Sequence, residues 1–255
     1  ANVLGVPFGT FIGQSFGWRT SFWIVAALGV FSLAGIAALV PKGQGAGPVG
    51  LAREVRVLKE PQVWLALAMT VLGFGGVFVV FTYIAPILES VTGFSPRAVT
   101  LVLVVFGAGL TLGNAIGGRL ADRALMPSLM GILVVLVLVM AAFARTSHVP
   151  VLAVSTVFIW GVAAFATVPP LQMRVVEKAR HAPHLASTLN IGAFNVGNAG
   201  GAWLGGLALS HGLALDALPW VAAAVTVVAL MVTAVAQRLD SRRAVQPQRA
   251  PERVC

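Results

Sequence analysis

Charged residues are scarce in this chain of 255 residues, where Asp, Glu, Lys and Arg together account for 10% and hydrophobic residues for 58%. Soluble domains carry about 25% charged residues on average, so this composition excludes an ordinary soluble fold. Cutting the sequence at its charges leaves eight uncharged runs long enough to cross a bilayer. They are residues 1–18, 20–41, 61–88, 98–118, 124–144, 146–173, 185–215 and 217–237. The composition therefore predicts an all-α, polytopic membrane helix bundle of about eight transmembrane helices.

Cysteine is also nearly absent, because Cys255 is the only one in the chain. A single cysteine excludes an internal disulfide and a cysteine-based metal cluster. The four histidines fall in loops or at membrane edges, with a spacing that suits no metal site. No Gly-x-x-x-x-Gly-Lys-Ser/Thr phosphate loop and no Ser/His/Asp grouping occurs. We therefore expect no enzyme activity, no metal and no cofactor.

Acidic residues are missing from the predicted membrane interior, because all eight fall in loops or at helix ends. The polar side chains that do lie there are uncharged amides and hydroxyls, with aromatic rings nearby. Such groups suit an amphipathic organic molecule better than an inorganic ion. The predicted residues of a substrate cavity are Gln14, Thr82, Tyr83, Trp160, Asn190 and Asn195.

Basic residues are divided unevenly between the predicted loops. Of the 17 Lys and Arg, 14 fall in alternate loops and the C-terminal tail, and the other loops hold only Arg19, Arg97 and Arg145. The positive-inside rule therefore predicts a cytoplasmic C-terminus. The net charge of +9 is spread over short loops with no folded domain to present it, so orientation and anionic lipid explain it better than nucleic acid.

Two glycine triplets with a spacing of four lie 192 residues apart in the sequence. They are Gly5, Gly9 and Gly13, and Gly197, Gly201 and Gly205. A spacing of four places each triplet on one helix face. The interval equals about six helices at ~32 residues per helix and loop, and transporters are often built from two such units. An internal repeat and ordinary close helix packing both account for the triplets.

The repeat predicts four regions along the chain. Residues 1–40 would be the last two helices of an N-terminal half-bundle, and residues 61–237 a C-terminal six-helix half-bundle. Residues 41–60 would form a cytoplasmic linker, and residues 238–255 a basic cytoplasmic tail. Because the chain starts inside an apolar run without a signal-peptide pattern, we expect four further helices to precede residue 1.

A short charged motif, Gly117-Gly118-Arg119-Leu120-Ala121-Asp122-Arg123, separates two of the uncharged runs. Since charges are costly in hydrocarbon, the motif marks a membrane surface. It resembles the Gly-x-x-x-Asp-Arg signature that the major facilitator superfamily places between its second and third helices and repeats between its eighth and ninth. The family motif continues x-Gly-Arg-Arg, whereas this chain continues Ala124-Leu125-Met126-Pro127. The resemblance implies that the eight runs correspond to helices 5–12 of a twelve-helix transporter.

Three further stretches resemble the proton-linked exporter branch of that superfamily, which contains chloramphenicol-resistance and arabinose-efflux-type proteins. Residues 2–10 resemble the Gly/Pro motif of the fifth helix of antiporters, residues 82–86 the seventh helix and residues 189–198 the eleventh. The resemblance implies a monomeric, multi-pass inner-membrane antiporter. It would export a small amphipathic, drug-like compound in exchange for protons by alternating access. A sugar or metabolite exporter and a non-transporting membrane scaffold are the alternatives.

The resemblance also implies roles for two sets of residues. The conformational latch of the charged motif would consist of Gly118, Arg119, Asp122 and Arg123. The seal between the two half-bundles would consist of Gly5, Pro7, Gly9, Gly13, Gly197, Gly201 and Gly205. A topology anchor without gating and plain helix packing are the respective alternatives.

Overall fold

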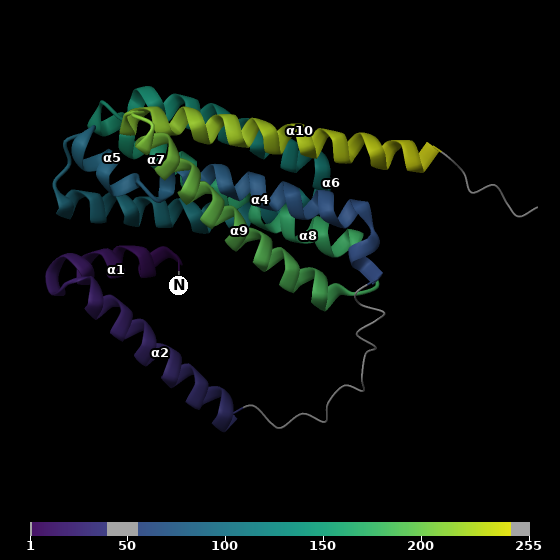
Figure 1. Ribbon diagram of the computed structural model, residues 1–255, viewed down its shortest axis with the longest axis horizontal. Helices are drawn as coiled ribbons and strands as arrows, with labels where there is room; N and C mark the ends of the chain where they lie inside the picture. The colour runs from purple at the N-terminus through teal and green to yellow at the C-terminus, as the bar shows by residue number, and fades with distance from the viewer. Residues whose placement is uncertain (1, 40–55, 246–255) are drawn as a thin grey trace, which may run out of the picture.

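The computed structural model describes residues 2–39 and 56–245, and in these ranges every regular element is a helix (Figure 1). The predicted all-α fold is confirmed for this part of the chain. The elements are α1 (Asn2–Phe16), α2 (Trp18–Leu39), η1 (Arg56–Lys59), α4 (Pro61–Phe81), α5 (Ile84–Ser90), α6 (Pro96–Thr146), α7 (Pro150–Ala166), α8 (Val168–Lys178), α9 (Pro183–Ser210), η2 (Leu215–Ala217) and α10 (Leu218–Val245).

Proline and glycine set many of the helix ends. A proline occupies the first or second position of α4, α6, α7, α8 and α9. The backbone N–H groups of the first turn have no partner within a helix, so proline, which has no N–H, costs no hydrogen bond there. Gly17 between α1 and α2 has φ +85°, and Gly212 after α9 has φ +86°. A side chain is disfavoured at these angles, so glycine suits both turns.

Helix α6 consists of two arms that fold back on each other. Its 51 residues would extend about 76 Å if straight, far more than the ~30 Å of a bilayer core. Ala124 has extended backbone (φ −158°, ψ 87°) in the middle of the helix, directly after the charged motif. Thr92, before α6, donates a hydrogen bond of 2.7 Å to the carbonyl oxygen of Ser147, after α6. Both ends of α6 therefore lie at the same end of the bundle.

Five segments of the described residues are long and apolar enough to cross a membrane. They are 18–39, 61–90, 96–146, 150–178 and 215–242. Since α6 folds back at Ala124, the third segment supplies two arms. The prediction of eight crossings also needs α1 and α9, and it stays a prediction.

The helices from α4 to α10 pack into one bundle around a core of large buried side chains. Trp160 of α7, Phe143 of α6, Met69 of α4 and Leu171 of α8 are fully buried there. Helix α10 crosses α4 where a Cβ on Gly76 would lie 3.1 Å from the carbonyl oxygen of Ala222. The bundle continues as helix to Val245, past the predicted end of the last span at residue 237.

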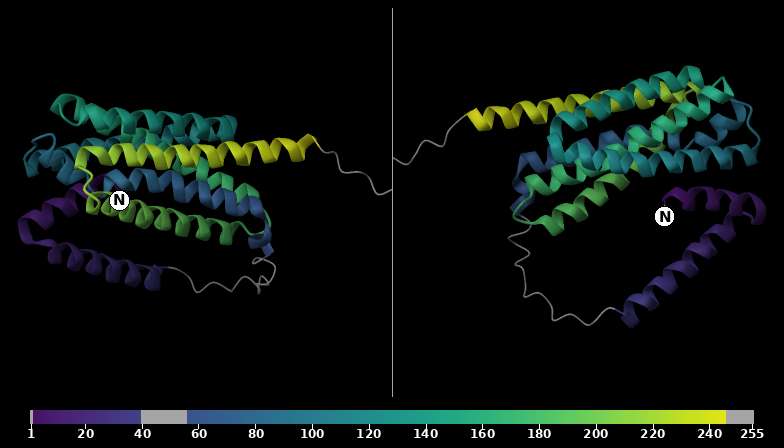
Figure 2. Two further views of the ribbon diagram at one scale, coloured as in Figure 1. Left: turned by 45° about the horizontal axis from the view of Figure 1, so that its top comes forward. Right: turned by 180° about the vertical axis from the view of Figure 1, so that it is seen from behind.

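Helices α1 and α2 form a hairpin in which α1 lies beside the bundle and α2 stands away from it (Figures 1 and 2). The Ser21 hydroxyl donates a hydrogen bond of 3.3 Å to the Gly9 carbonyl oxygen across the hairpin. Helix α1 packs against α6, while α2 has no buried residue. The division into residues 1–40 and 61–237 stays a prediction. Residues 40–55 and 246–255, which contain most of the predicted linker and part of the tail, lie outside the described residues.

Candidate functional site

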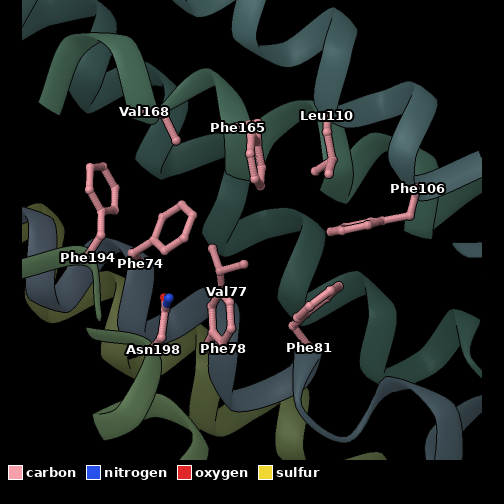
Figure 3. A pocket seen from close by; sticks show the side chains of 10 residues that line it. All are labelled: Phe74, Val77, Phe78, Phe81, Phe106, Leu110, Phe165, Val168, Phe194 and Asn198. Carbon is pink, nitrogen blue, oxygen red and sulfur yellow. The ribbon is translucent and has the colours of Figure 1, made fainter. Parts of the chain in front are cut away.

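A cavity of about 340 Å³ lies in the bundle between α4, α6, α7, α8 and α9 (Figure 3). Its wall is mostly aromatic. The lining residues are Phe74, Val77, Phe78, Phe81, Phe106, Leu110, Phe165, Val168, Phe194 and Asn198. A concave, largely apolar site with few polar groups is the usual form of a small-molecule site.

Helix α4 supplies the longest part of the wall. Phe74, Val77, Phe78 and Phe81 have the i, i+3, i+4, i+7 spacing that places side chains on one helix face. The neighbouring helices add their rings to this stripe. The Phe74 and Phe194 centroids are 4.8 Å apart with nearly perpendicular planes (81°). Edge-to-face pairs of this kind are favourable, so the wall is a continuous set of contacting rings.

Trp160 lies behind this wall and does not line the cavity. It is fully buried on α7, with its ring centroid 4.8 Å from Phe106 and 6.2 Å from Phe81 and from Phe143. Its indole N–H has no hydrogen-bond partner among the described residues. Trp160 therefore supports two cavity phenylalanines from the core side.

Asn198 is the only polar residue among the lining residues in the described part of the chain. Its side chain lies near Phe74, Phe78 and Phe194 (Figure 3). The amide oxygen Oδ1 is buried and accepts no hydrogen bond from any described residue. An unpaired buried acceptor costs about 1–3 kcal/mol. Because this oxygen is buried, a ligand in the cavity would reach it only after a rotation of the Asn198 side chain.

Asn190 lies one helical turn before Phe194 and belongs to a buried polar network instead. The Thr70 hydroxyl donates to Asn190 Oδ1 (2.7 Å), and Asn190 Nδ2 donates to Gln172 Oε1 (2.6 Å). Gln172 Nε2 in turn donates to Ser187 Oγ (2.9 Å). The network joins α4, α8 and α9 side by side.

Three of the other predicted cavity residues, Thr82, Tyr83 and Asn195, form hydrogen bonds to backbone carbonyl oxygens. Tyr83 donates a hydrogen bond of 3.1 Å to the Ala202 carbonyl oxygen. Thr82 and Asn195 are exposed, and each bonds to a carbonyl oxygen one turn earlier in its own helix. Gln14 lies on α1, and its side chain is outside the described set. Tyr83, Thr82 and Asn195 do not line the aromatic cavity in the described structure. Contact of these residues and of Gln14 with substrate stays a prediction.

The three glycines of α9 face α4 at backbone distance. A Cβ on Gly197 would lie 2.6 Å from the Val71 carbonyl oxygen, and one on Gly205 would lie 3.0 Å from the Val79 carbonyl oxygen. Gly201 meets the Gly75 carbonyl oxygen in the same way. The first triplet differs, because a Cβ on Gly5 or Gly9 would meet nothing within 4 Å. Whether either triplet seals two half-bundles stays a prediction.

A further glycine stripe, which the sequence analysis missed, joins α6 to α7. Gly109, Gly113 and Gly117 have a spacing of four and face the α7 backbone. A Cβ on Gly109 would lie 2.6 Å from the Phe158 carbonyl oxygen, and one on Gly117 would lie 2.7 Å from the Ala166 Cα. The same spacing that revealed the other triplets is present here in the sequence.

The charged motif lies directly before the bend of α6. Arg119, Asp122 and Arg123 are exposed, and a Cβ on Gly118 would meet nothing within 4 Å. The Ser128 hydroxyl donates a hydrogen bond of 2.8 Å to the Leu120 carbonyl oxygen across the bend. Within residues 56–245 no ion pair to Asp122 forms. The predicted latch stays a prediction.

A buried ion pair ties α8 to α10 at the same end of the bundle. Arg174 is 2% exposed, and its Nη2 lies 2.6 Å from Asp240 Oδ2. Lys178 Nζ donates to Asp240 Oδ1 at 2.9 Å, and Arg174 also donates to Gln62 Oε1 at 3.5 Å. Over the described ranges, no group of three or more His, Cys, Asp and Glu side chains could hold a metal ion.

The chain is similar to several curated membrane transporters. It is 42% identical to "Inner membrane transport protein YdhP" of Escherichia coli strain K12, over all of this chain and 63% of the relative. It is 33% identical to "Putative transporter AraJ" of the same strain, over 86% of this chain and 56% of the relative. It is 32% identical to the "Chloramphenicol resistance protein" of Streptomyces lividans, over 91% of this chain and 60% of the relative.

The chain thus spans less than two thirds of the length of these relatives. The family model of the Major Facilitator Superfamily matches residues 1–202, which include the charged motif and the described cavity residues. The resemblance predicted from the motifs is confirmed, and the relatives indicate a transporter and not an enzyme. This chain belongs to the major facilitator superfamily.

Proposed function

We propose that the chain forms part of a secondary active transporter that exports a small amphipathic organic compound by alternating access. The observation that supports this proposal most strongly is the aromatic cavity with the unpaired oxygen of Asn198. Six phenylalanine rings would bury an apolar or aromatic body. Asn198 Oδ1 would accept one hydrogen bond and so fix the orientation of that body.

The lining disfavours the sugar-export alternative. A sugar carries hydroxyl groups on every side, and each would need a partner once it left water. The described lining offers one amide for this purpose. One relative, from Mannheimia succiniciproducens, is named "Probable sugar efflux transporter" and is 31% identical over 83% of this chain. If that relative exports sugars as its name says, we expect it to place more polar groups at these ten positions.

Export and proton coupling rest on the family resemblance and on the names of relatives. The chloramphenicol resistance protein supports export of a drug-like compound, and YdhP supports a multi-pass location in the inner membrane. The described cavity lining contains no carboxylate, so a proton site would lie elsewhere in the complete protein. We place the C-terminus in the cytoplasm, because the end of α10 lies where most described Lys and Arg residues gather.

The glycine seams support movement of the bundle as one body. Helices that touch at backbone distance along several turns resist sliding, because any shift brings atoms into overlap. The α4–α9 and α6–α7 seams lie on either side of the cavity. Alternating access would then move α4 to α10 together against another part of the complete protein.

The test uses the complete gene product that contains residues 1–255, reconstituted in proteoliposomes with an imposed pH gradient. Efflux of a lipophilic aromatic probe such as chloramphenicol or ethidium is measured with and without a protonophore. We expect the probe to accumulate on one side of the vesicle membrane while the pH gradient lasts. This accumulation should disappear when the protonophore removes the gradient. Phe78→Ala should raise the probe KM at least about tenfold, while Leu138→Ala on the exposed face of α6 should leave it unchanged. Flux that ignores the pH gradient would refute antiport, and no flux of any probe would favour the scaffold alternative.

A further inference from the structure

Basic side chains gather at one end of the bundle. The start of α4, the bend of α6, the end of α8 and the C-terminal part of α10 all lie there (Figure 1). The basic residues at this end whose side chains the structure describes are Lys59, Arg119, Arg123, Arg174, Lys178, Arg180, Arg238 and Arg242. In a membrane protein this end lies at the level of the lipid headgroups.

A groove of about 570 Å³ opens at this end between α10 and the second arm of α6. Its lining residues are Met130, Ala234, Gln237, Arg238, Ser241 and Arg242. Helix α10 and residues 125–146 contribute nothing to the described lining of the aromatic cavity. The groove is therefore separate from the proposed substrate site.

The two arginines of the groove form no ion pair within the described part of the chain. Arg238 and Arg242 are four residues apart, so they lie on the same face of α10. Neither forms an ion pair with any described carboxylate, because Asp240, the nearest in sequence, is taken by Arg174 and Lys178. Each guanidinium offers five N–H donors in a planar fork that matches phosphate oxygens.

Apolar surface continues from the groove toward the middle of the bundle. Val134 lies one turn beyond Met130 on α6 and is 43% exposed. Met231 lies one turn before Ala234 on α10 and is 57% exposed. A Cβ on Gly131 would meet nothing within 4 Å, so the space beside α6 is open. Cationic donors thus adjoin a surface that hydrocarbon chains can cover.

We propose that this groove binds the phosphodiester headgroup of an anionic phospholipid. Arg238 and Arg242 would donate hydrogen bonds to the phosphate oxygens, and Gln237 would donate from its amide. The acyl chains would lie along Val134 and Met231. The site requires that α6 and α10 lie in a bilayer, as family membership implies, and it does not depend on the transported compound.

The test measures binding of single lipids to the complete, detergent-solubilised protein by native mass spectrometry. Phosphatidylglycerol and phosphatidylcholine are compared on the parent and on the double variant Arg238→Gln/Arg242→Gln. A loss of about 1 kcal/mol per arginine corresponds to about thirtyfold weaker phosphatidylglycerol binding. Phosphatidylcholine carries the same phosphodiester beside a choline cation, so it should bind the parent more weakly and lose less binding in the double variant. The matched control, Arg97→Gln/Arg145→Gln, removes equal charge at the opposite end and should bind phosphatidylglycerol as the parent does.

Two further arms separate a lipid site from a free-anion site and from a folding defect. Inorganic phosphate at millimolar concentration should not displace phosphatidylglycerol, and displacement would overturn the lipid assignment. Arg238→Lys/Arg242→Lys keeps both charges and should retain most of the binding, with an unchanged melting temperature. Equal phosphatidylglycerol binding by the glutamine double variant and its control would also overturn the proposal. Because the readout is lipid binding, a failure of the proposed transport function would leave this result intact.

Discussion

Asn190 and Asn195 lie on the same helix, and their surroundings predict that replacement by alanine will affect the stability of the protein differently at the two positions. At 3.6 residues per turn, five residues rotate the helix by about 140° beyond a full turn, so the two amides face different surroundings. Asn190 is fully buried between Thr70 and Gln172, whereas Asn195 is exposed and bonds to the Ile191 carbonyl oxygen. The comparison isolates burial, because residue type and helix are the same.

The expected cost of Asn190→Ala follows from the two hydrogen bonds that it removes. Side-chain hydrogen bonds between membrane helices contribute about 0.6 kcal/mol on average and about 1.7 at most. Two such bonds give a loss of about 1–3 kcal/mol. Thr70 partly compensates, because its hydroxyl also lies 3.3 Å from the Ala66 carbonyl oxygen. Asn195→Ala should cost no more than about 0.5 kcal/mol, as surface substitutions usually do.

The assay measures thermal unfolding of both variants in the same detergent. Samples are heated to a series of temperatures, and the folded protein that remains is measured by size-exclusion chromatography. Asn190→Ala should unfold several degrees below the parent, and Asn195→Ala should match the parent. Adding Thr70→Val to Asn190→Ala should cost less than Thr70→Val alone, because the shared hydrogen bond is already lost. Equal midpoints for the two alanine variants would refute the polar network as a stabilising tie.

Two other variants test the packing of the bundle. Gly113→Ala should cost about 1–3 kcal/mol, because its Cβ would overlap the α7 backbone, whereas Gly118→Ala on the same helix faces open space and should be tolerated. Chromatographic homogeneity and melting temperature of the pair measure this, and equal behaviour would contradict the α6–α7 seam. Arg174→Gln should cost about 1–3 kcal/mol, because it removes a charge-assisted hydrogen bond from Asp240, which is 26% exposed and keeps Lys178. Arg180→Gln, at a side chain that is 76% exposed, should change the melting temperature little. A neutral Arg174→Gln would show that Lys178 alone satisfies Asp240.

The aromatic cavity shows which of its lining residues can be predicted from the helix period and which cannot. The phenylalanines at 74, 78 and 81 could have been identified from the sequence, since they share one face of a single helix. Phe106, Phe165 and Phe194 come from three other helices, and no sequence spacing links them to α4. Sequence reasoning selected polar residues instead, because uncommon polar groups in apolar runs attract attention. The structure places the polar Asn190 in a helix-joining network and leaves Asn198 at the cavity.

Composition, charge distribution and the Gly-x-x-x-Asp-Arg motif determined from sequence alone that this chain is an α-helical membrane protein of the major facilitator superfamily. These properties depend on the free energy of transferring each residue into lipid and on the spacing of residues close together in the sequence. Both can be read from the sequence without a structure. Tertiary structure alone decided which glycines meet a neighbouring backbone, which asparagine is buried and which arginine pairs with Asp240. These outcomes depend on the rotation and register of each helix against its neighbours, and they are set by packing among residues more than a hundred positions apart.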